Sequence, residues 1–366
     1  MEFGILFTSH PHPTSEPYPH REVHARVTAE IQAAETLGYD TAWVAEHHFS
    51  NQYGIMPDVF TYLGYLAAKT SCIRLGTAVV TVPLYEPVRV VENLAFVDIL
   101  SGGRVMLGLG SGYRPYEFAG FGREFAARHD RQDEAIALIL ELLHTRRTTH
   151  QGPDFHATIT GEYEVFPVSV QQPHPPLFMA AGTERSMAYA ARHGFGLMLS
   201  TLPSFETLAR QVRFYREHVQ EARAPLNQNP ACGNVDVARW VYVAETDAAA
   251  KRDTEAGIVR HLSHFLSAAT SGYLGNVSEK DRMDTLDYDT LAATTLVHGS
   301  PETVIGRLRA LRDQTALTSL LLHYPPSYGH EKTMQSLRLF AEHVMPAFRP
   351  PSKGTQNGVG HHAEEA

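Results

Sequence analysis

Residues 41–49 read TAWVAEHHF, a short apolar run that leads directly into a glutamate and two histidines. The run at 41–44 predicts a buried strand, and Glu46, His47 and His48 follow at its carboxyl end. Barrel enzymes built from alternating strands and helices carry their catalytic groups at that end. If the backbone stays extended, His47 points to one face of the strand and its two neighbours point to the other. We therefore expect only one of the two histidines to face a given pocket.

The rest of the chain repeats this pattern of an apolar run, a polar loop and an amphipathic segment. Apolar runs predict strands at residues 3–7, 41–44, 73–82, 105–109, 177–180, 196–199, 235–244 and 318–323. Apolar residues at helical spacing predict helices at 22–37, 58–69, 87–100, 129–144, 184–193, 205–223, 247–295, 301–312 and 331–344. Alternating units of this kind predict a parallel sheet with helical crossovers. Eight of them close most simply as a (β/α)8 TIM barrel, an α/β fold.

The predicted barrel occupies residues 1–347 as a single domain. An insertion rich in Gly, Pro and β-branched residues separates the fourth and fifth strands at 151–176, and residues 162–167 in it predict a small hairpin. A helical insertion follows the seventh strand and includes a Gly- and charge-punctuated stretch at 272–289. Residues 348–366 lack a periodic apolar pattern and predict a disordered tail.

The composition is that of a soluble globular enzyme, because 43% of the residues are hydrophobic and 19% are charged. The net charge of -9 and the scattered positions of the 31 Lys and Arg argue against a nucleic-acid partner. Cys72 and Cys232 are too few for a disulfide framework or a thiolate zinc site, and they suit a reducing compartment. With neither a signal-peptide pattern nor an apolar stretch of membrane-spanning length, we expect a cytoplasmic protein without a membrane partner.

Five motifs, in this order and spacing, resemble those of the bacterial luciferase-like flavin-dependent monooxygenases of the FMN branch. They are FGILF at 3–7, GYDTAWVAEHHF at 38–49, RLGTAV at 74–79, GRVMLGLGSG at 103–112 and GSPE at 299–302. The resemblance implies a barrel that binds reduced FMN and uses O2 to oxygenate a small organic substrate. It also implies an NAD(P)H:flavin reductase as partner and, for most of the family, a dimer, so we expect a homodimer. In agreement, no Gly-x-Gly-x-x-Gly turn for tight dinucleotide binding opens a helix after the first strands.

The resemblance also implies the catalytic residues. His47, directly after Glu46, occupies the position of the family's catalytic histidine, and imidazole suits proton transfer at neutral pH. The non-proline cis peptide that lies behind the flavin in this family corresponds to the bond between Ala78 and Val79.

The cofactor phosphate is expected at the turn that follows the fifth strand. Ala181, Gly182, Thr183, Arg185 and Ser186 lie where a strand ends and a helix begins, and such a turn offers free N–H groups to an anion. The alternative is that Thr183 only caps the helix.

At two positions the sequence differs from luciferase in ways that affect the expected phosphate site and the expected substrate. Luciferase has Cys-Arg at the positions of Gly110 and Ser111, so its phosphate-contacting arginine is absent there, and Arg185 is the candidate to replace it. Glu86 stands where luciferase has a histidine, so we expect a monooxygenase that emits no light.

Three other interpretations remain open at this stage. A metal-dependent barrel hydrolase is suggested by the pair His10 and His12 after the first strand, although the later strand ends lack further ligands, and we expect no metal. A deazaflavin-dependent oxidoreductase would share the fold, and a non-catalytic flavin-binding subunit would have lost the active site. The pocket walls are expected from residues Tyr53, Tyr113, Tyr116, Phe118 and Tyr324.

Overall fold

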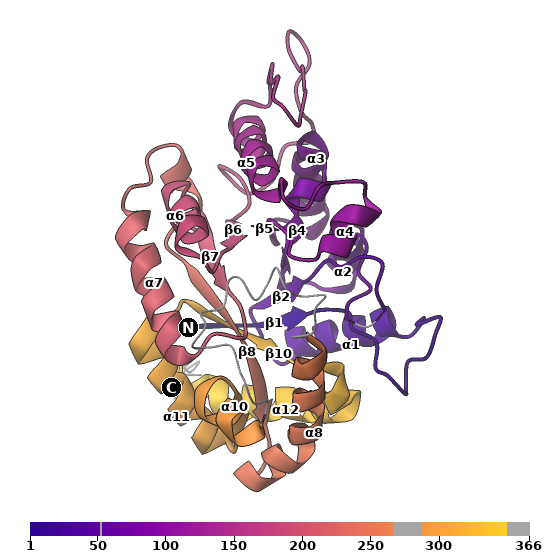
Figure 1. The fold of residues 1–366 in the computed structure, drawn as a ribbon, viewed down its shortest axis with the longest axis vertical. Helices are drawn as coiled ribbons and strands as arrows, with labels where there is room; N and C mark the ends of the chain where they lie inside the picture. Colours follow the sequence, from indigo (N-terminus) through magenta and orange to yellow (C-terminus); the bar gives the residue numbers. More distant parts are fainter. Residues whose placement is uncertain (52, 266–286, 350–366) are drawn as a thin grey trace, which may run out of the picture.

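The computed structural model describes residues 1–51, 53–265 and 287–349. Its centre is a closed barrel of parallel strands surrounded by helices (Figure 1). The barrel strands are β1 (Glu2–Phe7), β2 (Thr41–Val44), β3 (Arg74–Thr77), β5 (Val105–Gly110), β6 (Leu177–Ala180), β7 (Gly196–Leu199), β8 (Val235–Val243) and β10 (Ser319–His323). Closure comes from β10, which pairs with both β1 and β8. The predicted (β/α)8 barrel is therefore confirmed.

Two short strands lie beside this barrel. β4 (Val80–Thr81) pairs with β5, and β9 (Val297–Gly299) pairs with the distal half of β8. The predicted third strand at 73–82 is thus two strands, β3 and β4, with residues 78 and 79 between them.

Most helices follow the strands as the sequence predicts, with boundaries that differ by a few residues. The short helix at Pro115–Gly120 was not predicted, and the predicted helical segment at 247–295 is described as two helices with residues 266–286 outside the described ranges. The described helices are α1 (Val23–Thr36), α2 (Val59–Lys69), α3 (Pro87–Ser101), α4 (Pro115–Gly120), α5 (Arg128–Thr145), α6 (Glu184–Arg192), α7 (Phe205–Val219), α8 (Asp247–Phe265), α10 (Tyr288–Thr294), α11 (Pro301–Thr315) and α12 (His330–Leu339). Side-chain caps fix several of their starts: Asp58 accepts from the N–H of Thr61 at α2, and Ser300 accepts from that of Thr303 at α11.

Side chains fill the barrel interior below the carboxyl ends of the strands. Outward side chains of the strands pack against the helices, whereas Trp43, Met106 and Phe178 occupy the barrel interior. Trp43 fits only because residue 76 is glycine: a Cβ there would lie 2.2 Å from the indole ring. The packed interior forms the floor beneath any ligand that enters from the carboxyl end.

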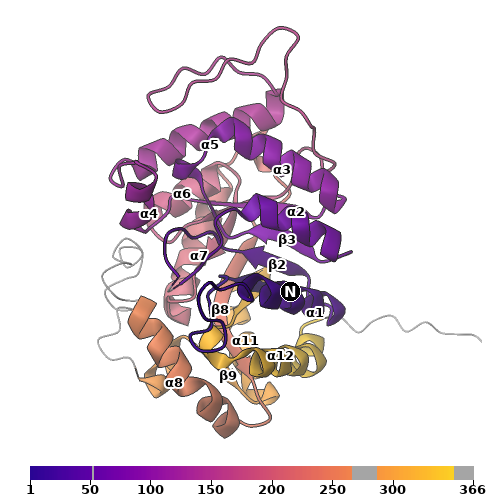
Figure 2. The same cartoon turned by 90° about the vertical axis from the view of Figure 1, so that its right-hand side faces the viewer.

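The segment between α5 and β6 extends away from the barrel beyond α5 (Figures 1 and 2). The hairpin predicted at 162–167 is wrong, because the antiparallel bridges join Thr148 to Ile159 and Gln151 to His156. Residues 162–167 contain no strand, and Glu164 instead forms ion pairs of 2.7 and 2.6 Å with Arg146 and Arg147. Most of the predicted stretch at 272–289 and of the tail at 348–366 lies outside the described residues.

Candidate active site

The carboxyl ends of the strands surround a cavity of about 210 Å³. A cavity that holds a single water molecule needs only about 10–15 Å³ of such space, so this cavity is large enough for an organic ligand. Its walls come from the loops after β1, β2, β3, β5, β6 and β7, from the strands β1, β8 and β10, and from the helices α4, α7 and α8. This is the end of the barrel at which the catalytic residues were expected.

Most of the residues predicted from the sequence meet in this cavity. Seven of the ten line it: Glu46, His47, Ala78, Val79, Ser111, Ala181 and Gly182. The other three, Thr183, Arg185 and Ser186, are not among its lining residues. Of the predicted wall residues, Tyr53 and Tyr113 line the cavity, whereas Tyr116, Phe118 and Tyr324 do not.

His47 is held by Glu117, a buried residue of α4 that the sequence analysis did not identify. Oε1 of Glu117 lies 3.1 Å from Nδ1 of His47 and accepts the backbone N–H of His48 at 3.0 Å. An ionised carboxylate can only accept, so Nδ1 of His47 carries the proton. Nε2 then presents a lone pair, and the hydroxyl of Tyr113 lies 3.5 Å from it.

Burial and charge set the protonation states of this pair. Burial lowers the pKa of His47 and outweighs the opposing effect of Glu117. Burial also raises the pKa of Glu117, but the hydrogen bonds from His47 and from the His48 backbone outweigh it and hold that pKa below its usual range. At neutral pH the pair is therefore a neutral imidazole and an ionised carboxylate.

Glu46 belongs to a second network beside the first. Its two oxygens accept from the hydroxyl of Tyr85 at 2.5 Å and from Nε2 of His48 at 3.0 Å. Burial raises the pKa of Glu46. Of the two histidines, only His47 lines the cavity, as expected. Glu46 lines it as well, contrary to the expected alternation, because residues 45–48 are not part of the strand.

The peptide bond between Ala78 and Val79 is cis, at the position that the family resemblance predicts. Both residues line the cavity between β3 and β4. Gly110 on the neighbouring β5 gives them room, because a Cβ at residue 110 would lie 2.5 Å from Val79 Cγ2.

The turn before α6 is built as a capping box. The hydroxyl of Thr183 accepts the N–H of Ser186 at 3.2 Å, and the hydroxyl of Ser186 accepts the N–H of Thr183 at 3.1 Å. Arg185 is exposed and lies 3.5 Å from Asp133 and 3.9 Å from Asp130 of α5. The capping role considered as the alternative is therefore present, and phosphate binding by these residues stays a prediction.

Aromatic side chains cover the cavity on the side of β8 and α8. The ring of Tyr53 lies 4.8 Å from that of His47 and 6.1 Å from that of His261, and the ring of His261 lies 6.3 Å from that of Trp240. The guanidinium of Arg114, which is buried, stacks 4.4 Å from the Tyr53 ring. Trp240 and His261 were not identified from the sequence, since they lie inside ordinary strand and helix patterns.

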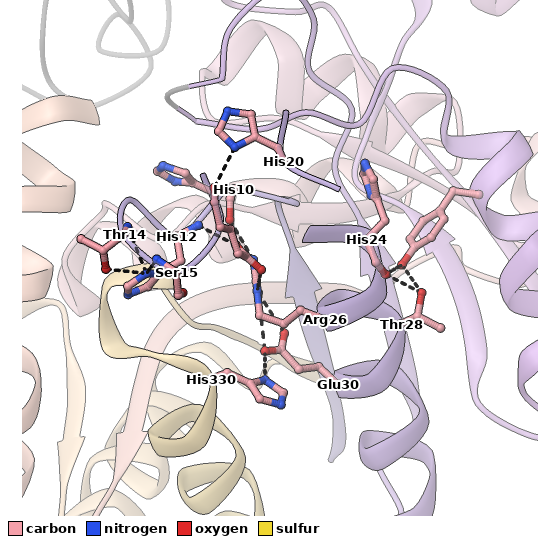
Figure 3. Close-up of polar contacts among 12 residues, drawn as sticks. His10, His12, Thr14, Ser15, His20, His24, Arg26, Thr28, Glu30 and His330 are labelled. Carbon is pink, nitrogen blue, oxygen red and sulfur yellow. Dashed lines mark hydrogen bonds and ion pairs between the residues drawn. The ribbon is translucent and has the colours of Figure 1, made fainter. Parts of the chain in front are cut away.

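His10 and His12 belong to an anchoring network (Figure 3). Nδ1 of His12 accepts the N–H of Ser15 at 3.1 Å, and Arg26 donates to the backbone oxygen of His10 at 2.8 Å. Arg26 also binds Glu16 at 2.6 Å, which ties the loop after β1 to α1. Within the described ranges, no three His, Cys, Asp or Glu side chains are grouped to hold a metal ion.

The sequence matches the model of the luciferase-like monooxygenase family over residues 1–318. The chain belongs to this family. An F420-dependent glucose-6-phosphate dehydrogenase from Amycolatopsis mediterranei is 28% identical over 86% of this chain and 92% of its own length. The oxygenase component of a flavin-dependent trigonelline monooxygenase from Acinetobacter baylyi is 24% identical over 95% of this chain and 96% of its own length.

The fold is also shared with solved structures. The oxygenating constituent of 3,6-diketocamphane monooxygenase from Pseudomonas putida, in complex with FMN, matches with a TM-score of 0.77 at 20% identity, covering 94% of this chain and 98% of that one. Family membership identifies this protein as an oxidoreductase whose relatives include both flavin-dependent and F420-dependent enzymes. Among the described residues, no helix is both long and apolar enough to span a membrane.

Proposed function

We propose that this luciferase-like protein is the oxygenase component of a two-component FMN monooxygenase. It takes reduced FMN from an NAD(P)H:flavin reductase and uses O2 to oxygenate a small organic substrate in the cytoplasm. The observation that carries the proposal is the neutral His47, oriented by Glu117, in the wall of a cavity that is large enough for an organic ligand.

The polar groups on one side of the cavity fit the flavin. Gln211 of α7 lines the cavity, and its Nε2 donates to the carbonyl of Gly182 at 2.9 Å. That bond fixes the orientation of the amide, so Oε1 points elsewhere, and Oε1 is buried without a partner in the described part of the chain. A buried acceptor of this kind is satisfied by a ligand donor such as a ribityl hydroxyl.

The phosphate would lie at the turn of residues 181–186. The first-turn N–H groups of a helix lack partners within the helix, and the capping box satisfies only those of Thr183 and Ser186. The N–H groups of Glu184 and Arg185 therefore remain to receive an anion, aided by the positive end of the helix dipole. The Ser186 hydroxyl donates to the backbone oxygen of Thr183 at 3.0 Å and the two hydroxyls lie 2.8 Å apart, so a phosphate would receive a hydroxyl proton only by replacing one of these contacts.

Reduced FMN supplies the electrons that activate O2 when it is bound. The chain contributes Nε2 of His47, which carries a lone pair for a proton because Glu117 holds the ring proton on Nδ1; the Tyr113 hydroxyl lies 3.5 Å from this nitrogen. Glu46 and Tyr85 support the segment on which His47 lies. The rings of Tyr53, Trp240 and His261 reduce the access of water to the cavity.

The proposal is tested by adding a flavin reductase, NADH, FMN and a panel of ketones and alkenes to the purified protein under ¹⁸O2. We expect one labelled oxygen atom in the product. His47→Ala should reduce product formation by about 100-fold or more, the usual range for loss of a general acid or base, while FMN still binds. Unchanged turnover in that variant contradicts the role of His47.

A deazaflavin-dependent oxidoreductase is the second candidate, because the relative from Amycolatopsis mediterranei depends on F420. Such an enzyme would transfer hydride and would incorporate no oxygen from O2. Binding of the two cofactors separates the candidates directly.

A homodimer is supported by an apolar patch on α2 and α3. Phe96, Ile99 and Leu100 of α3 and Tyr65 of α2 are all exposed, and Gly64 lies next to Leu100. Exposed apolar side chains that gather on one face commonly mark a protein interface. Light scattering of the purified protein measures whether two copies associate.

A further inference from the structure

We propose that Trp240 recognises the substrate by donating its indole N–H to an oxygen acceptor of an uncharged molecule, such as the carbonyl of a ketone. The inference deepens the proposed function and rests on it, because it assigns the side of the cavity opposite the flavin to the substrate.

The first observation is an unsatisfied, buried donor on a side chain that lines the cavity. Trp240 is 1% exposed and lines the cavity, yet its Nε1 has no hydrogen-bond partner in the described part of the chain. Leaving a buried polar group unpaired destabilises the structure. The indole nitrogen can only donate, so the missing partner is an acceptor.

The second observation is the place of Trp240 in the barrel. Around the closed sheet, β8 is the fourth strand from β3 in either direction, so Trp240 lies across the barrel from Ala78 and Val79. Gln211, whose unpaired atom is an acceptor, lies instead beside Gly182 at the end of β6. The two unsatisfied groups therefore differ in both position and chemistry, and they suit two different ligands.

The path from Trp240 to His47 is continuous. The rings of Trp240, His261, Tyr53 and His47 follow one another with centroid distances of 6.3, 6.1 and 4.8 Å. A molecule that accepts from Trp240 therefore lies against the same aromatic wall as the imidazole that we assign to proton transfer.

The third observation is the charge of the cavity. Among its described lining residues there is no Lys or Arg, and both carboxylates, Glu46 and Glu117, already accept hydrogen bonds. Burial lowers the pKa of His323, another lining residue, to about 4, so it is neutral at pH 7. An anionic substrate would lose its hydration without gaining a cationic partner. The cavity therefore favours an uncharged substrate.

The test uses the two indole N–H signals of the protein, because Trp43 and Trp240 are its only tryptophans. Trp43→Phe assigns the signals in a ¹H–¹⁵N spectrum of the FMN-loaded protein. Trp43 is also a matched control, since its Nε1 is likewise buried without a partner in the described residues, but it does not line the cavity.

Three probes of similar shape are added in turn: cyclohexanone, methylenecyclohexane, which lacks the oxygen, and cyclohexanecarboxylate. We expect cyclohexanone to shift the Trp240 signal downfield and leave the Trp43 signal in place, with a smaller shift from methylenecyclohexane. Absence of a Trp240 shift with the ketone, or tighter binding of the carboxylate than of the ketone, overturns the proposal.

The variant Trp240→Phe keeps an aromatic ring and removes the donor. Its dissociation constant for cyclohexanone should rise about five- to tenfold, the value of one hydrogen bond, and that for methylenecyclohexane should stay the same. Equal weakening of both probes would mean that Trp240 is only a packing surface. Flavin fluorescence measures FMN binding before any probe is added. If FMN does not bind, the proposed function is wrong. The same probe titration on the flavin-free protein then still tests the role of Trp240.

Discussion

The substitution Glu117→Gln removes the charge beside His47 and leaves the shape of the site unchanged. Both groups that face Oε1 of Glu117, the His47 ring at 3.1 Å and the His48 backbone at 3.0 Å, are donors. The amide of glutamine must therefore turn its oxygen towards them, and both hydrogen bonds persist. Only their charge assistance is lost.

The size of the effect follows from that loss. Hydrogen bonds to charged groups contribute about 1.5–3 kcal/mol and neutral ones about 0.5–1.5 kcal/mol, so the midpoints of the two ranges differ by roughly 1.2 kcal/mol. One pKa unit corresponds to about 1.36 kcal/mol. Because Glu117 raises the pKa of His47 against the effect of burial, its neutralisation should lower that pKa by about one further unit.

The assay is the pH dependence of kcat/KM with reductase-supplied FMN. The acidic limb of the profile should move by about one unit towards lower pH in Glu117→Gln, while FMN affinity and the melting temperature change little. The control is Glu124→Gln, at an exposed position outside the cavity lining. An unchanged limb, or a limb displaced towards higher pH, refutes the claim that the charge of Glu117 raises the pKa of a catalytic His47.

Three other predictions concern protonation and the cofactor. Burial lowers the pKa of His298 to about 3, so between pH 6.5 and 3 the unfolded chain binds a proton that the folded chain excludes, and stability falls as pH falls. His298→Gln should reduce that slope by about 1.4 kcal/mol per pH unit in chemical denaturation between pH 6.5 and 4, whereas substitution of the exposed His343 should not. Burial raises the pKa of Asp236 to about 7, so stability is lost as pH rises from 3.8 to 7. Asp236→Asn should therefore stabilise the protein by roughly 4 kcal/mol at pH 8 and far less at pH 4. Equal effects at both pH values contradict the assignment. Replacing Thr183 and Ser186 by Ala should weaken FMN binding more than riboflavin binding. The control is Ser300→Ala, which removes the N-cap of α11. Equal weakening of both flavins would mean that the turn has a purely structural role.

The barrel could be predicted because each strand and helix has a recognisable local pattern of apolar residues. Apolar runs such as that at 41–44 and the helical spacing of the segments between them need no long-range information. The interruption of the third strand at Ala78 and Val79 does not show in the apolar pattern, and it was predicted only through the family resemblance.

The polar partners in the site could not be predicted in this way. Glu117 lies 70 residues from His47, and its contact exists only because the loops after β2 and β5 meet at the same end of the barrel. The orphaned N–H of Trp240 depends on what surrounds a strand residue that looks ordinary in sequence. The hairpin at 162–167 was wrong for a related reason, since the ion pairs of Glu164 with Arg146 and Arg147 bind that segment to the end of α5.

The most direct test of the central claim is a comparison of cofactor affinities under anaerobic conditions. Reduced FMN, reduced riboflavin and the reduced deazaflavin cofactor F420 are titrated into the same protein preparation, and binding is followed by calorimetry. The proposal predicts that reduced FMN binds most tightly, with reduced riboflavin weaker because it lacks the phosphate held at residues 181–186. Tight binding of the deazaflavin together with weak binding of reduced FMN would contradict the proposal and assign the protein to the F420-dependent members of its family.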